Sequence, residues 1–126
     1  MISDAAIRLL SGRLRSLLEW RNYLPALLRA VEDLLGEAEV YVFGLVVEGG
    51  LTAASDVDVA IVVERVPERA LERAKIVSKI LEALEGEGMP WWYPLEIHLM
   101  TEEELEMLRR GGAKFVRARG LLSASP

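Results

Sequence analysis

The stretch FGLVVEGGLTAASDVDVAIVV, residues 43–63, joins a glycine-rich segment to two aspartates and an apolar run. The β-branched and apolar residues that begin near Asp56 predict a buried β-strand. Side chains two positions apart share one face of a strand, so Asp56 and Asp58 are expected to point the same way. Val57 and Val59 would then face the core. The stretch therefore predicts a strand with a pair of carboxylates at its start.

Two interpretations of this carboxylate pair are open. Charges ~5 Å apart at an effective dielectric constant of ~20 repel by roughly 3 kcal/mol, which either water or a cation offsets. In the first interpretation, Asp56 and Asp58 belong to a solvated turn. In the second, they hold a divalent cation. Mg²⁺ is then expected, or Mn²⁺ in its place, because such ions bind carboxylate oxygens and leave positions open for phosphate.

Helical and strand patterns on both sides of this stretch predict an α/β (α+β) fold. Apolar residues spaced three and four apart predict a helix capped by Ser3 or Asp4, a second capped by Asn22, and a third from Pro67 to Leu84. The other expected elements are the end of the second helix at Gly36, strands over residues 38–43 and 95–100, a glycine-rich loop after residue 43, and a helix over residues 101–110 with a capping box. This order predicts a short mixed sheet packed mainly on one side against helices.

Three of the predicted helices have an apolar stripe. The stripe of the first makes it amphipathic, and that of the third is expected to face the sheet. The residues of the first stripe are Ile7, Leu10, Leu14, Leu17 and Leu18, those of the second are Leu24, Leu27, Leu28, Val31, Leu34 and Leu35, and those of the third are Leu71, Ala74, Val77, Leu81 and Leu84. The 126 residues predict a single domain, with a helical part over 1–36, a catalytic core over 37–110 and a tail over 111–126.

The composition excludes several classes of protein and of site. With no cysteine and one histidine, the chain has no disulfide, no thiolate metal site and no histidine-rich zinc site. A net charge of −5 argues against a general nucleic-acid-binding surface. No apolar stretch reaches the ~20 residues that a membrane span needs, and the N-terminus is not typical of a secretion signal. We therefore expect a cytoplasmic protein, and the scarcity of thermolabile residues suits a thermophile.

Further residues favour the cation over the solvated turn. Glycine at positions 44 and 49 lets backbone N–H groups approach a phosphate closely. In the strand LEIHLM, residues 95–100, Glu96 and His98 take the face opposite to the apolar residues. A third carboxylate is thus expected beside the aspartates, which is typical of a two-metal site for phosphoryl transfer.

The order of these residues resembles the minimal nucleotidyltransferase family of the DNA polymerase beta superfamily. The resemblance covers residues 40–100 and consists of a strand, two spaced glycines, Ser-Asp-x-Asp on a strand, and a later strand carboxylate. It implies a nucleotidyltransferase fold and the Mg²⁺-dependent transfer of a nucleoside monophosphate from a triphosphate such as ATP to an acceptor hydroxyl. By resemblance, the catalytic and metal-binding residues are Asp56, Asp58 and Glu96, and the nucleotide-binding residues are Gly44, Gly49 and Ser55.

The resemblance also implies a partner, and the loop leaves a second function open. The family suggests a separate helical protein of the HEPN type in a toxin–antitoxin-like pair, and a homo-oligomer is compatible with the chain. Where the family's loop has serine and arginine, this chain has Leu45 and Glu48. These two residues favour the alternative of an inactive or weakened binding module, antitoxin-like or nucleotide-sensing. For residues 91–93, WWY, packing on the core or on a partner is weighed against stacking on a base.

Overall fold

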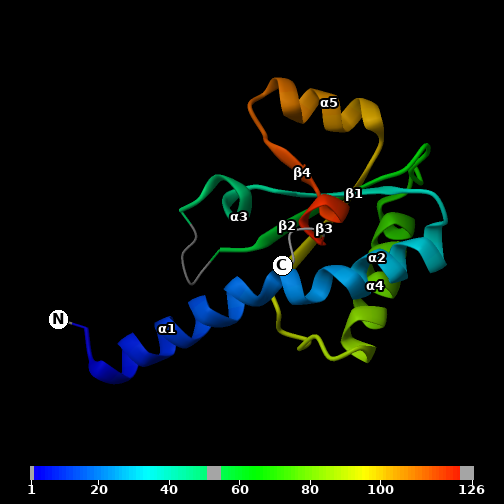
Figure 1. Ribbon diagram of the computed structural model, residues 1–126. Helices are drawn as coiled ribbons and strands as arrows, with labels where there is room; N and C mark the ends of the chain where they lie inside the picture. Colours follow the sequence, from blue (N-terminus) through cyan, green and yellow to red (C-terminus); the bar gives the residue numbers. More distant parts are fainter. Residues whose placement is uncertain (1, 51–54, 123–126) are drawn as a thin grey trace.

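The computed structural model describes residues 2–50 and 55–122 and contains a four-stranded sheet with helices on both faces (Figure 1). The predicted N-terminal and C-terminal parts extend to residues 1 and 123–126, which lie outside the described residues. The strands are β1 (Glu39–Phe43), β2 (Val57–Val62), β3 (Leu95–Met100) and β4 (Phe115–Arg117), in the order β3-β2-β1-β4. Strands β2 and β3 are parallel, and β1 runs antiparallel to β2 and β4. The predicted mixed α/β fold is confirmed.

The main core lies between the sheet and two helices, α2 (Leu24–Leu35) and α4 (Ala70–Gly86). Alternate residues of a strand share a face, and Val57, Val59 and Ile61 of β2 accordingly enter this core together. All three are 1% exposed or less, so β2 is the most deeply buried strand of the site described below. The apolar face of β2 fixes which of its polar side chains point away from the core.

The opposite face of the sheet is covered only in part, by helix α5 (Glu102–Arg110), which Figure 1 shows on the other side from α2 and α4. Leu105 of α5 is fully buried in a second, smaller apolar cluster with Tyr41 and Met100. The predicted capping box is confirmed, because the Thr101 side chain accepts from the Glu104 N–H and the Glu104 carboxylate accepts from the Thr101 N–H. Helix α5 therefore leaves part of this face for other side chains.

The N-terminal helices differ from the prediction in one cap. Helix α1 (Asp4–Leu17) is capped by Ser3, as expected. The chain then continues through a 3₁₀ helix, η1 (Leu18–Tyr23), so the predicted cap Asn22 lies inside a helical segment and the prediction is wrong. Helix α2 begins at Leu24, with proline in its first turn, and ends at Gly36 as predicted.

Helix α1 extends away from the body of the molecule (Figure 1). Its apolar stripe is buried only at the C-terminal end, at Leu17, whereas Ile7 and Leu10 are 47% and 41% exposed. The described part of the chain thus leaves most of this stripe uncovered.

The predicted third helix is real but starts later, and part of its predicted face is wrong. Helix α4 begins at Ala70, and the carbonyl of Pro67 instead accepts a 2.8 Å hydrogen bond from the Arg73 side chain. Ile80 and not Leu71 is buried. These two residues are nine apart, which is two and a half turns, so they lie on opposite sides of the helix.

Two short elements after residue 110 are absent from the sequence prediction. Strand β4 adds to the edge of β1, and helix α6 (Ala118–Leu122) places Ala118 in the main core. The ring of Phe115 packs on Phe43 at a centroid distance of 4.7 Å. A three-residue strand has too few positions for a recognisable alternation, so packing and not pattern defines it. Among the described helices, none is both long and apolar enough to span a membrane.

Candidate functional site

Asp58 and Glu96 lie side by side on the two parallel strands. Asp58 is the second residue of β2 and Glu96 the second residue of β3, and the two positions are direct partners in the sheet register. Because Val57 and Val59 point into the main core, the side chain of Asp58 points to the opposite face. Ile97 of β3 also enters the main core, so the side chain of its neighbour Glu96 points to the opposite face. The sheet therefore brings two carboxylates together on the face that α5 covers only in part.

His98 completes this group. Its Nε2 atom lies 3.2 Å from Oδ1 of Asp58 and 3.8 Å from Oε1 of Glu96. One ligand atom from each of the three residues falls within 4.8 Å of the others. The sequence placed His98 on the face of Glu96, but no other signal assigned it a role. The missing information was the position of β3 directly beside β2.

The group is open to solvent on one side and backed by an aromatic ring on the other. The side chains of Asp58, His98 and Glu96 are 25%, 36% and 53% exposed. Phe43, the register partner of Asp58 on β1, meets the His98 ring edge to face at a centroid distance of 5.2 Å. An ion or a substrate can thus reach the group without any displacement of the core.

Gly44 is fitted closely to Asp58. Its φ angle is +77°, in the region that side chains disfavour. A Cβ atom at this position would lie 2.5 Å from Oδ2 of Asp58. Glycine is therefore required here both by the backbone conformation and by the carboxylate that occupies the adjacent space.

The predicted glycine-rich loop after residue 43 contains a short helical element. Residues 45–48 form one helical turn, α3 (Leu45–Glu48), in which the N–H groups of Val47 and Glu48 donate to the Gly44 carbonyl. Gly49 follows with a φ angle of +90°, and a Cβ atom there would meet no neighbour within 4 Å. Glycine adopts the positive φ angles at both ends of this turn without steric cost, and the Gly49 N–H donates to the Leu45 carbonyl to close it.

Asp56 and Ser55 lie outside the three-residue group. Asp56 precedes β2, is exposed, and lines a separate pocket together with Ser55, which is 8% exposed. Among the described residues, the group with converging ligand atoms holds Asp58, Glu96 and His98 and does not include Asp56. Of the three carboxylates predicted from the sequence, the structure thus brings two together.

The chemistry of the donor set fits a divalent cation. Two carboxylates supply negative charge and oxygen ligands, which suit Mg²⁺, Ca²⁺ and Mn²⁺. The imidazole of His98 adds a nitrogen ligand, which suits Mn²⁺ and the later transition metals. Because the two acids lie on adjacent strands of one sheet, the backbone positions that carry them are fixed before any ion arrives.

The fold and this carboxylate pair agree with the comparison to known families. Residues 24–117 match the family model of a nucleotidyltransferase domain. The chain belongs to this family. The match covers well over half of the chain and contains all four strands, α2, α4 and α5, so it supports the resemblance to the polymerase beta superfamily. No curated protein and no solved structure matches the chain.

Membership of the nucleotidyltransferase family gives the carboxylates a chemical context. Proteins of this kind act on nucleotides and generally require divalent metals, and Asp58, Glu96 and His98 form a group that can hold one. Catalysis of phosphoryl transfer depends on positioning and on neutralising phosphate charge more than on covalent chemistry. A pair of carboxylates on adjacent strands beside an open face is suited to that task.

Proposed function

We propose that this nucleotidyltransferase domain transfers a nucleoside monophosphate from a nucleoside triphosphate to an acceptor hydroxyl, with Mg²⁺ as its metal and pyrophosphate as the leaving group. The observation that carries the proposal is the pairing of Asp58 with Glu96 across two parallel strands, with His98 against both. Asp58 and Glu96 would hold the cation, together with Asp56 once the nucleotide is present. The bound metal supplies neutralisation of the phosphate charge and polarisation of the phosphorus–oxygen bonds.

The residues of the chain act on the acceptor and on the triphosphate. Glu96, the most exposed member of the group, accepts the proton of the acceptor hydroxyl. The acceptor oxygen then forms a bond to the α-phosphorus while the bond from that phosphorus to the bridging oxygen breaks. The electron pair of the broken bond leaves with pyrophosphate. Asp58, held by His98 and by the space at Gly44, keeps its position throughout.

The proposed nucleotide-binding residues are Gly44, Gly49 and Ser55. Gly44 brings the backbone next to Asp58, and Gly49 presents open space at the far end of α3. Ser55 precedes Asp56 and lines the same pocket. These positions support a triphosphate that lies along the start of β2, because backbone without a side chain permits close approach of phosphate oxygens.

A specific observation favours a second candidate function, a nucleotidyltransferase-fold binding module with weak or no catalysis. Leu45 and Glu48 are both exposed at α3, so neither is required by the core. Leu45 offers no hydroxyl, and Glu48 adds a negative charge where phosphates would lie. A subunit that senses a nucleotide or neutralises a partner tolerates both residues.

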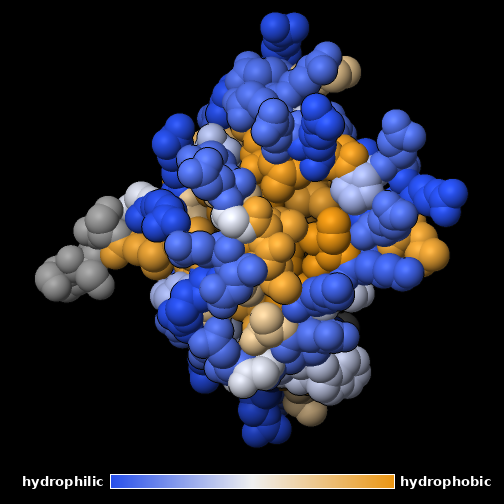
Figure 2. All heavy atoms as spheres, turned by 90° about the vertical axis from the view of Figure 1, so that its right-hand side faces the viewer, coloured by the Kyte–Doolittle hydropathy of each residue, from blue (hydrophilic) through white to orange (hydrophobic). Residues whose placement is uncertain are grey.

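We infer that the acceptor hydroxyl belongs to a partner protein, for which a helical protein of the HEPN type is the proposed candidate. The uncovered stripe of α1 supports this, since Ile7 and Leu10 are open to a partner helix. Figure 2 shows a further gathering of apolar side chains across the middle of one side of the molecule, bordered by hydrophilic ones. Apolar areas of this kind are typical of surfaces that bind another protein.

The experiment is an incubation with α-labelled ATP and the other triphosphates, Mg²⁺ and a cell extract, followed by separation of labelled protein and nucleotide products. We expect transfer by the wild type and at least a hundredfold loss in Asp58→Asn, because phosphoryl transfer depends on charge neutralisation at this position. Glu103→Gln, a change of an exposed acid on α5, is the matched control and should keep full activity. If the protein binds a triphosphate but transfers nothing to any acceptor, the transfer reaction is overturned and the binding module takes its place as the proposed function.

A further inference from the structure

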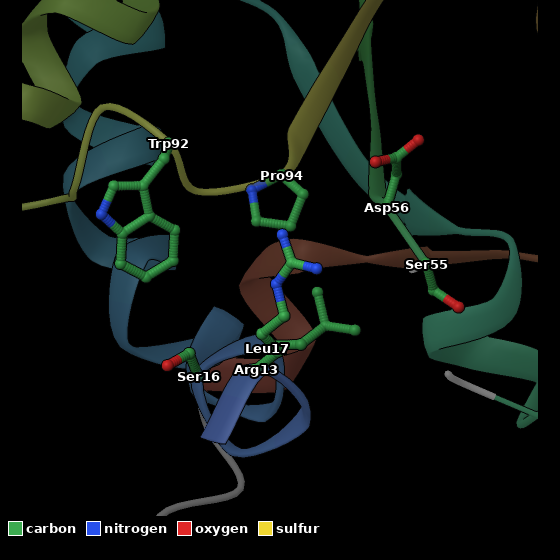
Figure 3. A pocket seen from close by; sticks show the side chains of 7 residues that line it. All are labelled: Arg13, Ser16, Leu17, Ser55, Asp56, Trp92 and Pro94. Atoms are coloured by element: carbon green, nitrogen blue, oxygen red, sulfur yellow. The ribbon is translucent and has the colours of Figure 1, made fainter. Parts of the chain in front are cut away.

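A pocket of about 280 Å³ lies at the start of β2 and β3, the two strands that carry Asp58 and Glu96. Its lining comes from three separate parts of the chain, namely α1, the segment before β2 and the segment before β3. Figure 3 shows the guanidinium group of Arg13 reaching towards Pro94, with Trp92 to one side and Ser55 and Asp56 to the other. The pocket therefore runs from an aromatic end to an acidic end, with a cation between them.

The aromatic end has the properties of a stacking surface. The indole of Trp92 is 54% exposed and lines the pocket, whereas its neighbour Trp91 is 82% exposed and does not. Leu17 and Pro94 add apolar surface next to Trp92. A volume of about 280 Å³ lies just below the ~300–1,000 Å³ of typical ligand pockets, so the pocket would enclose part of a nucleotide and leave the rest at its open side.

The wall of this end is held in place by Tyr93. Its hydroxyl donates a 2.7 Å hydrogen bond to the carbonyl of Leu17, and its ring meets Tyr23 edge to face at 4.8 Å. These contacts tie the end of α1 and the end of η1 to the segment before β3. Arg13 lies four residues before Leu17, and Trp92 lies directly before Tyr93. Both side chains are thereby brought to the same pocket. A stacking surface that is ordered before binding costs less conformational entropy when the ligand arrives.

The middle of the pocket carries a cation available to a phosphate. In the part of the chain that the structure describes, no carboxylate lies within ion-pair distance of Arg13. Its guanidinium is planar and presents several donors, which is the geometry that binds phosphate oxygens in pairs. Arg13 lines the pocket with Asp56, two residues before Asp58. A phosphate at Arg13 would thus lie near the start of the strand that carries Asp58.

We infer that this pocket is the nucleotide-binding subsite of the domain, with the base stacked on Trp92 and the phosphates against Arg13. The inference rests on the proposed transfer reaction for the class of its ligand, a free nucleoside triphosphate. The α-phosphate then lies next to Asp56. Arg13 supplies the positive charge that α3 lacks, since Glu48 is acidic. A net charge of −5 favours a free nucleotide over a nucleic acid as the occupant.

The test measures binding of three probes by calorimetry at fixed salt, using ATP, adenosine and ribose 5-triphosphate. Trp92→Ala should weaken ATP and adenosine about 5- to 100-fold, as expected for one stacked base, and leave ribose 5-triphosphate unchanged. Arg13→Ala should weaken ATP and ribose 5-triphosphate about tenfold and leave adenosine unchanged. Trp91→Ala and Arg15→Ala are matched controls, because both residues are exposed neighbours that do not line the pocket.

The outcomes separate this inference from the proposed function. If Asp58→Asn abolishes transfer while Trp92→Ala and Arg13→Ala bind ATP as the wild type does, the subsite is overturned and the reaction stands. If the variants bind the three probes as expected but no acceptor is ever labelled, the subsite stands and the proposed transfer reaction is overturned. A short oligonucleotide that binds more tightly than ATP, and depends on Arg13 and Trp92, would assign the pocket to a nucleic-acid acceptor and overturn the inference. Circular dichroism of each variant confirms that the folded state is kept.

Discussion

Oδ2 of Asp58 lies 2.5 Å from the point that a Cβ atom on Gly44 would occupy. The carboxylate therefore fills the space that the missing side chain leaves, and the end of β1 sets the position of an acid on β2. Phe43, next to Gly44, also meets the ring of His98. The end of β1 thus supports two of the three members of the proposed metal-binding group.

Gly44→Ala should disrupt the proposed metal-binding group, because the new methyl group would displace the Asp58 carboxylate. We expect a loss of about 1–2 kcal/mol in the free energy of unfolding from the positive φ angle, and loss of the Mg²⁺-induced rise in Tm. Gly49→Ala is the control, since it has a φ angle of +90° but no neighbour within 4 Å. It should lose similar stability and keep the metal response. Equal metal responses in the two variants would contradict the role of Gly44.

The parts of the fold that follow from local pattern could be predicted from the sequence. The alternation around Val59 and the capping box at Thr101 predicted a strand and a helix that the structure contains. The pairing of Asp58 with Glu96 could not be derived in the same way, because it depends on which strands are neighbours and on their register. Sequence reasoning placed the acids on strand faces and expected Glu96 beside the aspartates, but only the sheet shows that Asp58 is its direct partner.

The prediction failed where packing overrides pattern. Asn22 is a good capping residue, but the chain remains helical through it because η1 joins α1 to α2 without a break.

The WWY segment divides between two environments. Tyr93 is buried, as the packing interpretation expects, whereas Trp91 and Trp92 are exposed. Three adjacent aromatic residues carry no periodicity from which this division could be derived.

His98 should make the metal-binding group favour Mn²⁺ over Mg²⁺, because imidazole nitrogen is a better ligand for Mn²⁺. His98→Asn is expected to lower Mn²⁺ affinity by about tenfold and to change Mg²⁺ affinity much less. Electron paramagnetic resonance of free Mn²⁺ gives the first affinity, and competition with Mg²⁺ gives the second. Glu103→Gln on α5 serves as the control for a general change in surface charge. A parallel fall in both affinities would mean that His98 only orients Asp58 through their 3.2 Å contact.

Replacing Leu45 with serine and Glu48 with arginine should tighten the binding of a Mg²⁺–triphosphate by about 1–3 kcal/mol, through one new hydrogen bond and a reversed charge. Both side chains are exposed at α3, so the double change should alter stability by no more than about 0.5 kcal/mol. Calorimetry measures the affinity, and Glu68→Arg, an exposed position outside the site, controls for net charge. Unchanged nucleotide affinity with weaker capture of a partner protein would instead support the binding module.

Tyr93→Phe should destabilise the protein and change how its stability depends on pH. The variant leaves the Leu17 carbonyl without its 2.7 Å hydrogen bond, a loss of about 1–3 kcal/mol for a buried acceptor. Burial raises the pKa of the Tyr93 hydroxyl well above its ordinary value of 10.0, with smaller contributions from Tyr23 and Glu19. The folded state therefore holds this proton more tightly than the unfolded state, so the stability from Tyr93 is complete below pH 10 and falls as the pH rises further. Urea denaturation from pH 8 to pH 11 should show this decline in the wild type and a weaker decline in Tyr93→Phe. Identical slopes in wild type and Tyr93→Phe would show that another group causes the loss of stability at alkaline pH.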